Sequence, residues 1–335
     1  MSPLISIIIS NLNGMSLNLL PECLDSLTNP GYPNWELLVI DNNSNDNSVD
    51  YLIKRFSNSK NCRVIQNPIN MYSQGLNLGA KNANGKYLAY FNNDVAIKKG
   101  YFQELVSQFK KDNKLAMAQG KIVNYYHRNV IDSAGETMDQ FGNPITIGAG
   151  EKDLGQYDKV EQILSASGSA CIIKKSIFKK QGGYDSDYGI GYEDMDLALQ
   201  TRRLGYSVKR FPKAIVYHKR ASTDLAEFIK IKVKWHFNKN RLTTMVKNYP
   251  WNLLFITLPV TLLLYLGITL YEWLVRRRWQ IGWVRITSIF WVLLNLPQIL
   301  LKRYKINKLG AKPLGPELSL FSPKSLRALN SDFAK

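Results

Sequence analysis

One short run of residues decides the fold: LISIIIS at positions 4–10, which leads directly into the polar sequence NLNG at positions 11–14. Short, continuously apolar runs rich in β-branched residues are typical of strands buried on both faces of a parallel sheet. Similar runs alternate with helical apolar spacing farther along, with strands at 35–40, 63–65 and 87–91 and helices at 17–27, 49–56 and 76–83. This alternation predicts an α/β domain with a doubly wound parallel sheet.

Polar side chains gather where these predicted strands end. Asn11 and Asn13 follow the first strand, Asp41 begins the polar run after the second, and Asn92-Asn93-Asp94 follows the fourth. In open α/β sheets, ligands bind beyond the carboxyl ends of the strands. The sequence therefore predicts a ligand pocket built from these three loops.

A second conspicuous stretch is GGYD at 182–185, followed by GYEDMDLAL at 191–199. Helical spacing begins after Gly191. Glu193, Asp194 and Asp196 therefore fall in the first helical turn, where the helix dipole stabilises negative charge. These carboxylates either only cap the helix, or one of them faces a cleft and acts as a general base.

Charge is distributed very unevenly along the 335 residues. Residues 1–200 carry 19 basic and 21 acidic side chains, whereas residues 201–335 carry 25 and 5. This length and 45% hydrophobic residues allow one large α/β domain with an appendage. A near-neutral front joined to a strongly basic rear predicts a catalytic body whose rear contacts a polyanionic surface.

The cysteines and the N-terminus indicate the compartment. Cys23, Cys62 and Cys171 show no metal-ligand spacing and are odd in number, which fits a reduced, cytoplasmic setting. We also expect no secretory signal, because no basic segment followed by an apolar run and a small-residue cleavage site precedes the first strand.

Five blocks of the chain, taken in order, resemble the inverting family 2 glycosyltransferases, which have the GT-A fold. The resemblance covers roughly residues 3–220 and implies a Rossmann-like domain that binds a nucleotide sugar. The blocks are residues 5–14, 39–44, 70–79, 85–95 and 182–196.

The resemblance implies that Asp41 binds the nucleobase, which is consistent with a carboxylate accepting the N3–H of a uracil or thymine ring. The alternative for Asp41 is a turn-forming residue that bonds its own backbone. Residues 70–79 would form the floor of the donor pocket, although Tyr72 stands where the family commonly has glycine. The implied donor-binding residues are Asn11, Asn13, Asp41, Asn43, Gly75, Asn77, Asn92 and Asn93.

A divalent cation is implied next to the donor diphosphate. The family's Asp-x-Asp motif here reads Asn92-Asn93-Asp94, which leaves Asp94 as the direct ligand and suits Asn92 to the ribose or a metal-bound water. His218, at the end of the last strand, is either structural or completes this cation site. Oxygen and imidazole ligands fit Mg²⁺ or Mn²⁺, but a single carboxylate leaves the metal requirement open.

The same resemblance makes Asp194 the general base of an inverting transfer, a reaction that needs one base opposite the leaving diphosphate and no covalent intermediate. Glu193 would position the sugar, and Asp196 would be structural. Gly168 and Ser169 are small residues that permit close approach of backbone to the sugar and acceptor. The polar, glycine-rich segment 124–158 is either a variable surface insertion or part of the substrate cleft.

The rear of the chain contains two long apolar runs, 251–275 and 281–301, separated by Arg276-Arg277-Arg278. The first reaches the roughly 20 residues that a membrane-spanning helix needs. A spanning hairpin would place the three arginines on the far side of the membrane, against the positive-inside tendency. Interfacial helices, which we favour, would keep every basic residue at the anionic cytoplasmic surface; two buried helices of a soluble domain are the third arrangement.

These patterns divide the chain into four predicted parts. Residues 228–247 mix lysines with apolar residues in the pattern of a basic amphipathic helix. The parts are a GT-A domain at 1–222, a basic amphipathic linker helix at 223–250, two hydrophobic membrane-associated helices at 251–305 and a polar basic tail at 306–335.

The sequence thus predicts a glycosyltransferase attached to the cytoplasmic side of the cell membrane, which moves a sugar from a nucleoside-diphosphate donor to a lipid-linked saccharide in cell-surface polysaccharide assembly. The Asn-Asn-Asp motif with an apolar rear is similar to rhamnosyltransferases, so dTDP-rhamnose is one donor hypothesis. A polyprenyl-phosphate sugar synthase of the same fold is an alternative. A non-catalytic nucleic-acid or membrane-binding protein is a second alternative, but nucleic-acid binding requires no bilayer-length apolar segment.

Overall fold

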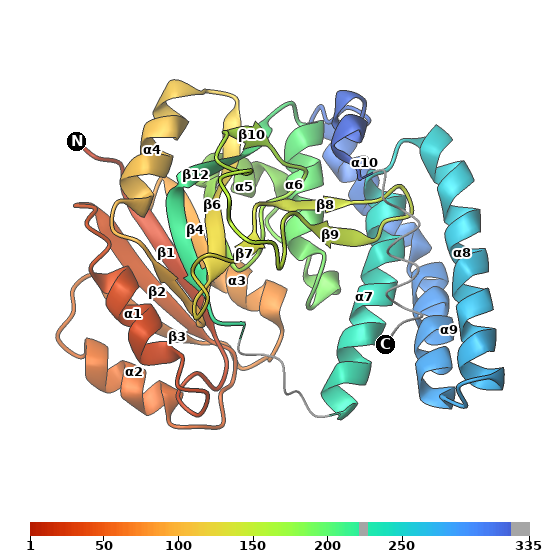
Figure 1. Ribbon diagram of the computed structural model, residues 1–335, viewed down its shortest axis with the longest axis horizontal. Coiled ribbons are helices and arrows are strands. Elements are labelled where there is room, and N and C mark those ends of the chain that lie inside the picture. Colours follow the sequence, from red (N-terminus) through yellow and green to blue (C-terminus); the bar gives the residue numbers. More distant parts are fainter. Residues whose placement is uncertain (221–226, 323–335) are drawn as a thin grey trace.

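The computed structural model describes residues 1–220 and 227–322. Residues 223–226 of the predicted linker and 323–335 of the predicted tail lie outside the described residues. Figure 1 shows a domain built on one large sheet and, beside it, a group of long helices from the second half of the chain.

The sheet domain contains elements from β1 to β12. Its strands are β1 (Ile5–Asn11), β2 (Trp35–Asp41), β3 (Cys62–Gln66), β4 (Tyr87–Asn92), β5 (Val95–Ile97), β6 (Leu115–Asn124), β7 (Ile131–Ser133), β8 (Glu136–Met138), β9 (Pro144–Thr146), β10 (Glu161–Gln162), β11 (Ala170–Lys174) and β12 (Ser207–His218). Its helices are α1 (Leu20–Thr28), α2 (Ser48–Phe56), α3 (Tyr72–Asn82), α4 (Tyr101–Lys111), α5 (Lys175–Gln181), the 3₁₀ helix η1 (Ser186–Tyr188) and α6 (Glu193–Arg203).

The main sheet is mixed, which corrects the predicted all-parallel sheet. Its order is β10-β12-β6-β11-β4-β1-β2-β3, with β5 paired to β12 and β7 to β6. The strands β3, β2, β1 and β4 are parallel, but β11 runs antiparallel to both β4 and β6. A continuously apolar run shows only that a strand is buried on both faces, and it carries no information on strand direction.

Strand β1 shows why its sequence is apolar throughout, since all seven of its residues are buried. Ile7 packs on one face of the sheet in a cluster with Leu24 of α1, whereas Ile8 packs on the opposite face with Leu76 of α3. Successive side chains of a strand point to opposite faces, so helices on both sides require an apolar residue at every position. The predicted two-sided burial of this strand is confirmed.

Four helices follow the sheet domain. They are α7 (Glu227–Asn248), α8 (Trp251–Leu274), α9 (Trp279–Leu294) and α10 (Leu296–Lys308), and the 3₁₀ helix η3 (Pro316–Leu320) comes after them. The predicted second apolar run, 281–301, is divided between α9 and α10, which meet at an angle of 60°. The break falls at Asn295, two residues before Pro297, which has no N–H to donate and whose ring would clash with the carbonyl of the residue four positions earlier in a continuous helix.

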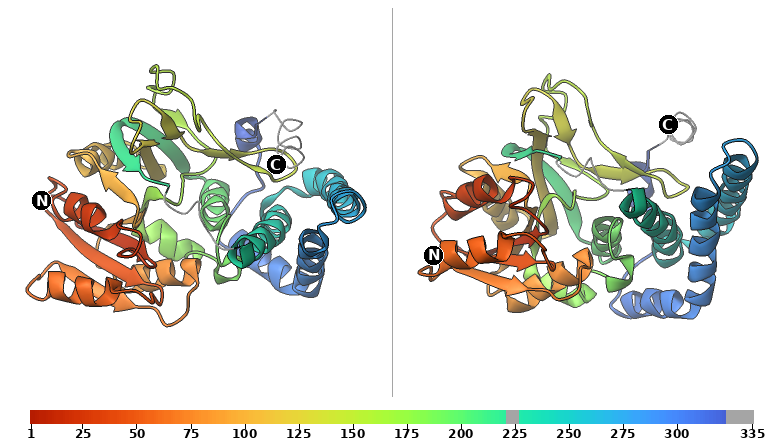
Figure 2. Two further views of the ribbon diagram at one scale, coloured as in Figure 1. Left: turned by 60° about the horizontal axis from the view of Figure 1, so that its bottom comes forward. Right: turned by 90° about the horizontal axis from the view of Figure 1, so that it is seen from below.

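Helix α7, predicted as a linker, packs between the sheet domain and the apolar helices, as Figure 2 shows with α7 seen nearly end-on. The face that it turns to the domain is polar yet buried, and includes Lys239, Asn240, Lys247 and Asn248. A basic sequence pattern here does not indicate a solvated surface, because the lysines find acidic and carbonyl partners in the domain.

Part of the predicted polar tail is also packed on the domain. Leu314 is buried, the hydroxyl of Thr137 donates a hydrogen bond of 2.6 Å to the carbonyl of Leu320, and the Ser322 amide donates one of 2.9 Å to the Met138 carbonyl. Residues 309–322 therefore return to strand β8, which lies in the segment 124–158.

Candidate active site

A network of polar side chains joins the carboxyl ends of β1, β2 and β4. The Asn11 amide donates to Asp41 Oδ2 at 2.7 Å, and the amide of Asn93 donates to Asn11 Oδ1 at 2.8 Å. The Ser44 amide and hydroxyl donate to the two Asp41 oxygens at 2.9 and 2.6 Å. Asp41 is only 1% exposed, so its carboxylate fixes the loop after β2 in this structure.

Two more of the residues predicted to bind the nucleotide sugar, Asn13 and Asn43, lie on the same cluster of loops. Asn13 accepts a hydrogen bond of 2.9 Å from the Asn45 amide, and its own amide donates to the Ser44 hydroxyl at 2.9 Å. Asn43 is exposed and has a left-handed φ of 65°. The structure thus brings together Asn11, Asn13, Asp41, Asn43 and Asn93.

Gly75 and Asn77 lie elsewhere, on α3. The Asn77 amide donates to the Tyr184 carbonyl at 2.8 Å, and its oxygen accepts from the Tyr184 amide at 2.9 Å. A Cβ at Gly75 would collide with the side-chain oxygen of Asn42. These two residues therefore have packing roles that tie α3 to the 182–185 turn and to the loop after β2. Their place in the floor of the donor pocket stays a prediction.

Six of the seven remaining predicted residues, all except Asp94, meet in one cavity of about 290 Å³. Its wall combines the end of β4, the loop before β11, the start of α6 and the end of β12. The predicted residues that line it are Asn92, Gly168, Ser169, Glu193, Asp194 and His218.

The Asp194 carboxylate is held at this cavity by backbone amides. Gly168 donates to Asp194 Oδ2 at 2.8 Å and Met195 donates to Oδ1 at 2.7 Å. Burial raises the pKa of Asp194, although these hydrogen bonds act in the opposite direction. A Cβ at Gly168 would lie 3.2 Å from Asp194 Oδ2, so the glycine permits this close approach, as the small residues there predict.

The turn before Asp194 is conformationally strained. Tyr192, the residue that precedes α6, has φ of 70°, a left-handed value that a bulky residue rarely adopts. Its hydroxyl donates to the Gly142 carbonyl at 2.9 Å, and its ring packs on Phe237 of α7 with ring centroids 5.8 Å apart. Strain of this kind persists only where surrounding contacts enforce it, and here those contacts aim the first turn of α6 at the cavity.

Two glutamates share the cavity with Asp194. Burial, and then the nearby Asp194 charge, raise the pKa of both Glu193 and Glu136 to about 8. Glu136 is held by the hydroxyls of Ser133 at 3.3 Å and Thr146 at 2.8 Å. Both glutamates are thus mainly protonated at neutral pH and can donate hydrogen bonds to a bound sugar.

His218 lies between two carboxylates. Its Nε2 is 3.2 Å from Asp94 Oδ2, and its Nδ1 is 2.7 Å from Asp132 Oδ2. Burial alone would lower the pKa of His218, but the bonds to Asp132 and Asp94 outweigh it and raise the pKa to about 9. Arg220 pairs with the other oxygen of Asp132.

This arrangement fits a divalent cation with two protein ligands. Asp94 Oδ2 and His218 Nε2 are neighbouring atoms that could both coordinate a metal ion. A carboxylate that contacts the other ring nitrogen, as Asp132 does here, usually fixes the orientation of a metal-binding histidine. No group of three or more His, Cys, Asp or Glu side chains suited to one ion occurs within residues 1–220 and 227–322. A cation here would therefore take its other ligands from the donor and from water.

Part of the chain matches a known protein family. Residues 6–182 match the model of glycosyl transferase family 2. The chain belongs to this family. It is 29% identical to the probable glycosyltransferase YdaM of Bacillus subtilis over 209 residues, which are 60% of this chain and 48% of that protein. It is 32% identical to the poly(ribitol-phosphate) beta-glucosyltransferase of Bacillus spizizenii over 130 residues, 38% of this chain and 20% of that protein.

The fold of this family 2 glycosyltransferase is also found among solved structures. The structure of GalNAc-T7 with UDP, GalNAc and Mn²⁺ aligns with a TM-score of 0.58 at 16% identity, over 74% of this chain and 48% of the other. This likeness establishes the GT-A-like fold. The chain spans about half or less of the length of these relatives.

Several residues of this glycosyltransferase site are absent from the sequence prediction. Asp132, Ser133, Glu136 and Thr146 line the cavity and come from the segment 124–158, which therefore forms part of the cleft wall. The sequence carries one signal that could have found these residues, namely two acidic residues, Asp132 and Glu136, beside small residues. The segment has no helical or strand periodicity, so the signal could not be placed in the fold. Tyr72, at the family's glycine position, also lines the cavity and donates to Asn92 Oδ1 at 2.7 Å.

Proposed function

We propose that this chain is an inverting glycosyltransferase in which Asp194 removes the proton of the acceptor hydroxyl while the sugar leaves its nucleoside diphosphate. One observation carries the proposal: Asp194 and His218 line the same cavity, and His218 contacts Asp94. A base on one side and a diphosphate-neutralising group on the other are the two requirements of direct displacement. Glu193 and Glu136 would hold the sugar hydroxyls between them.

The donor would lie across the ends of β1, β2 and β4. Asn11, Asn13, Asn93 and the loop fixed by Asp41 are the residues proposed for the nucleoside, and Asn92 faces the cavity toward the sugar. The enclosed carboxylate of Asp41 supports a role in shaping this loop as well as in base recognition.

Asp94 and His218 would hold a divalent cation such as Mn²⁺, which GalNAc-T7 carries in its solved structure. When bound, a cation supplies Lewis-acid stabilisation of the leaving diphosphate. Asp132 would keep the His218 ring oriented through Nδ1.

We therefore expect Asp132→Asn to weaken Mn²⁺ binding about 10- to 100-fold, since loss of such an orienting carboxylate has effects of this size. Titration calorimetry with Mn²⁺ and a nucleoside diphosphate measures it. Asp153→Asn is the matched control, because Asp153 lies in the same segment but pairs with Lys121 outside the cavity. Equal Mn²⁺ affinity in wild type and Asp132→Asn would contradict the metal site.

Cell-surface polysaccharide assembly is the proposed process, with a lipid-linked saccharide as acceptor. A relative named as a poly(ribitol-phosphate) beta-glucosyltransferase supports it. The polyprenyl-phosphate sugar synthase is the alternative, and offering polyprenyl phosphate against a polyprenyl-diphosphate saccharide separates the two.

The experiment that tests the function is a screen of labelled nucleotide sugars, dTDP-rhamnose included, with membranes that contain the protein, with and without Mn²⁺. We expect transfer from one donor into a lipid fraction. Absence of transfer from every donor, with the protein folded and Mn²⁺ bound, would overturn the assignment.

The outer surface of α8, α9 and α10 supports attachment to a membrane. Helix α8 is long and apolar enough to cross one, and only 33% of its most apolar window is buried. Its exposed side chains include Phe255 at 72% and Leu263 at 67% exposure. Contiguous exposed apolar surface of this kind marks an interaction site.

The packing of α7 favours an interfacial position over a spanning hairpin. Figure 1 shows α7 alongside α8 and α9. The rings of Trp235 and Trp291 are 6.3 Å apart, and Tyr265 of α8 donates to the α7 carbonyl of Asn238 at 3.3 Å. If α8 and α9 spanned a bilayer, the exposed lysines of α7 beside them would lie inside it. Placing each lysine at the bilayer centre costs roughly 2.5–3.5 kcal/mol of free energy. These lysines are Lys230, Lys232 and Lys234.

The double variant Phe255→Gln, Leu263→Gln should reduce binding to lipid vesicles on the order of 100-fold, because each buried aromatic or leucine side chain contributes about 1.5–3 kcal/mol. Vesicle flotation measures the bound fraction. Ile53→Gln, at a residue 55% exposed on α2, is the control and should float like wild type. A double variant that floats equally well would exclude this face as the membrane contact.

A further inference from the structure

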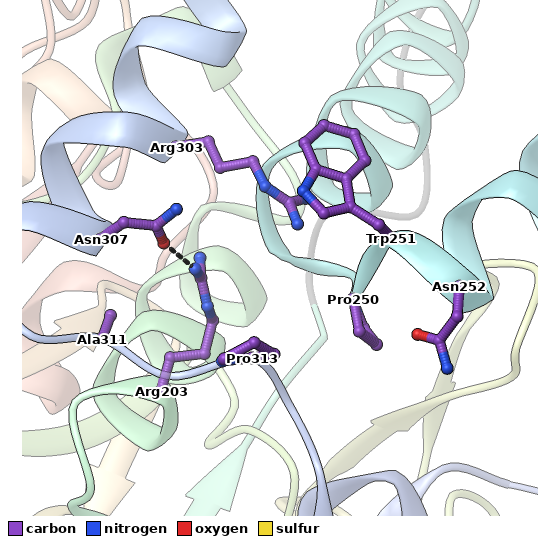
Figure 3. A pocket seen from close by; sticks show the side chains of 8 residues that line it. All are labelled: Arg203, Pro250, Trp251, Asn252, Arg303, Asn307, Ala311 and Pro313. Carbon is purple, nitrogen blue, oxygen red and sulfur yellow. Dashed lines mark hydrogen bonds between the residues drawn. The ribbon is translucent and has the colours of Figure 1, made fainter.

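A second cavity, of about 430 Å³, lies away from the catalytic cavity where the end of α6, the start of α8 and α10 meet (Figure 3). Arg203 comes from α6, Trp251 from α8 and Arg303 from α10. The other residues that line it are Pro250, Asn252, Asn307, Ala311 and Pro313.

The cavity contains two buried positive charges without acidic partners. Arg203 is 4% exposed and Arg303 is 6% exposed. Within the described parts of the chain, neither guanidinium has a carboxylate close enough for a salt bridge. Buried charges are ordinarily paired, so two adjacent unpaired arginines indicate a place for an anion.

The hydrogen bonds of the two arginines differ. Arg203 donates from each of its three nitrogens, to the carbonyls of Lys312 and Lys247 at 3.2 Å each and to the Asn307 side chain. Among the described residues, Arg303 donates through Nη1 to the Val246 carbonyl at 2.7 Å, and its buried Nε has no acceptor there. Arg203 therefore orders the cavity wall, whereas Arg303 has donor capacity left for a ligand.

Two further features favour an anion. The guanidinium of Arg303 lies over the ring of Trp251, 4.0 Å from its centroid, which fixes its plane, as Figure 3 shows. Helix α8 starts at Trp251 and has no side-chain cap, so the positive end of its dipole is directed here. A flat, fixed guanidinium beside free backbone amides suits phosphate oxygens.

The surroundings identify the source of that phosphate as a lipid. Trp251 is 48% exposed and stacks on Phe255, ring centroids 5.8 Å apart, and Phe255 begins the apolar outer face of α8. A ligand in the cavity would thus have a charged end at Arg303 and a continuous apolar surface leading away from it. This is the shape of a phospholipid.

We propose that the cavity between Arg203, Trp251 and Arg303 binds the phosphate headgroup of an anionic membrane lipid. The proposal rests on the membrane placement suggested above and not on the transfer reaction. The bound lipid would hold the start of α8 and helix α10 at the membrane surface.

The test is a titration of detergent-solubilised full-length protein with phosphatidylglycerol, followed by native mass spectrometry. Micelles avoid the surface potential of a bilayer, so general charge attraction is small. We expect one lipid retained per chain, at least tenfold weaker binding in Arg303→Gln, and a change of less than twofold in Lys305→Gln. Lys305 is exposed on the same helix and provides the matched loss of charge.

Arg303→Lys keeps the charge and guards against a folding defect in Arg303→Gln; it should bind several-fold more weakly than wild type with an unchanged melting temperature. Equal lipid binding in wild type and both variants would overturn the proposal. Binding of inorganic phosphate as tight as that of the lipid would overturn the lipid assignment and indicate a soluble phosphate. Neither result depends on glycosyl transfer, so this site can fail while the proposed enzyme activity stands.

Discussion

Asp194→Asn should lower the rate of sugar transfer by roughly 10²- to 10⁴-fold, the usual contribution of a positioned general base. The substitution keeps the size of the side chain, and its oxygen can still accept from the Gly168 amide, which bonds Asp194 Oδ2 at 2.8 Å. What is lost is the ability to take a proton, together with the hydrogen bond from the Met195 amide, because asparagine has one acceptor oxygen in place of two. Donor binding should therefore change by no more than about twofold, because the base acts on the acceptor.

The measurement is single-turnover product formation with the donor found in the screen, together with donor affinity by calorimetry. Asp187→Asn is the charge-matched control: this residue of η1 pairs with Lys302 at 2.6 Å, outside the cavity, and should keep wild-type activity. If Asp194→Asn retains more than a tenth of the transfer rate, Asp194 is not the base.

Lys247→Ala should destabilise the protein by about 3–5 kcal/mol, the range for breaking a buried ion pair from one side. Lys247 is buried, and its ammonium lies 2.6 Å from Asp185 Oδ2 and 2.8 Å from Asp196 Oδ2. Removing it leaves the buried Asp196 carboxylate without its cation, although the amides of Gln200 and Asn248 still donate to it. Urea unfolding in detergent measures the loss.

Lys302→Ala is the control for this prediction, because its side chain is 32% exposed and its pairs should contribute no more than about 1 kcal/mol. Acid supplies a second check. Burial would raise the pKa of Asp185, but Lys247 and Lys302 outweigh it and lower the pKa to about 2. A lowered native pKa stabilises the fold above about pH 4, and this contribution is lost as the pH falls toward 2.

Lys247→Ala should flatten that acid-dependent loss, since the main partner of Asp185 is gone. An unchanged unfolding midpoint in Lys247→Ala, or an unchanged acid profile, would show that the pair contributes little to the fold.

The meeting of Asn92, Asp194 and His218 at one cavity was predictable because these residues lie at strand ends and at a helix start. Asp194 and His218 are linked to periodic patterns that fix where each element stops, and the sheet then brings those ends together. The packing role of Asn77 could not be predicted in the same way. Its two polar atoms are used by the backbone of Tyr184, a contact 107 residues away that no local pattern reveals.

The sequence did not predict Asp132 and Glu136 as cavity residues for a different reason. Their segment has no dominant periodicity, and its position depends on long-range contacts, including those of residues 314–322 with β8. The buried face of α7 was also hidden, because Lys239 and Lys247 look like solvated residues in a basic helix. Only the partners Asp187, Asp185 and Asp196 show that these lysines belong to an interior.

The return of residues 309–322 to strand β8 has a practical meaning for anyone who wants a water-soluble form of the enzyme. Cutting the chain after β12 would remove Leu314 and expose the apolar cluster in which it is buried. It would also remove the contacts that hold β8, the strand that carries Glu136, and leave Asp196 without the Lys247 ammonium. Shortening is thus the wrong route. Polar replacements on the outward residues of α8, such as Phe255 and Leu263, would improve solubility while every helix that supports the catalytic cleft stays in place.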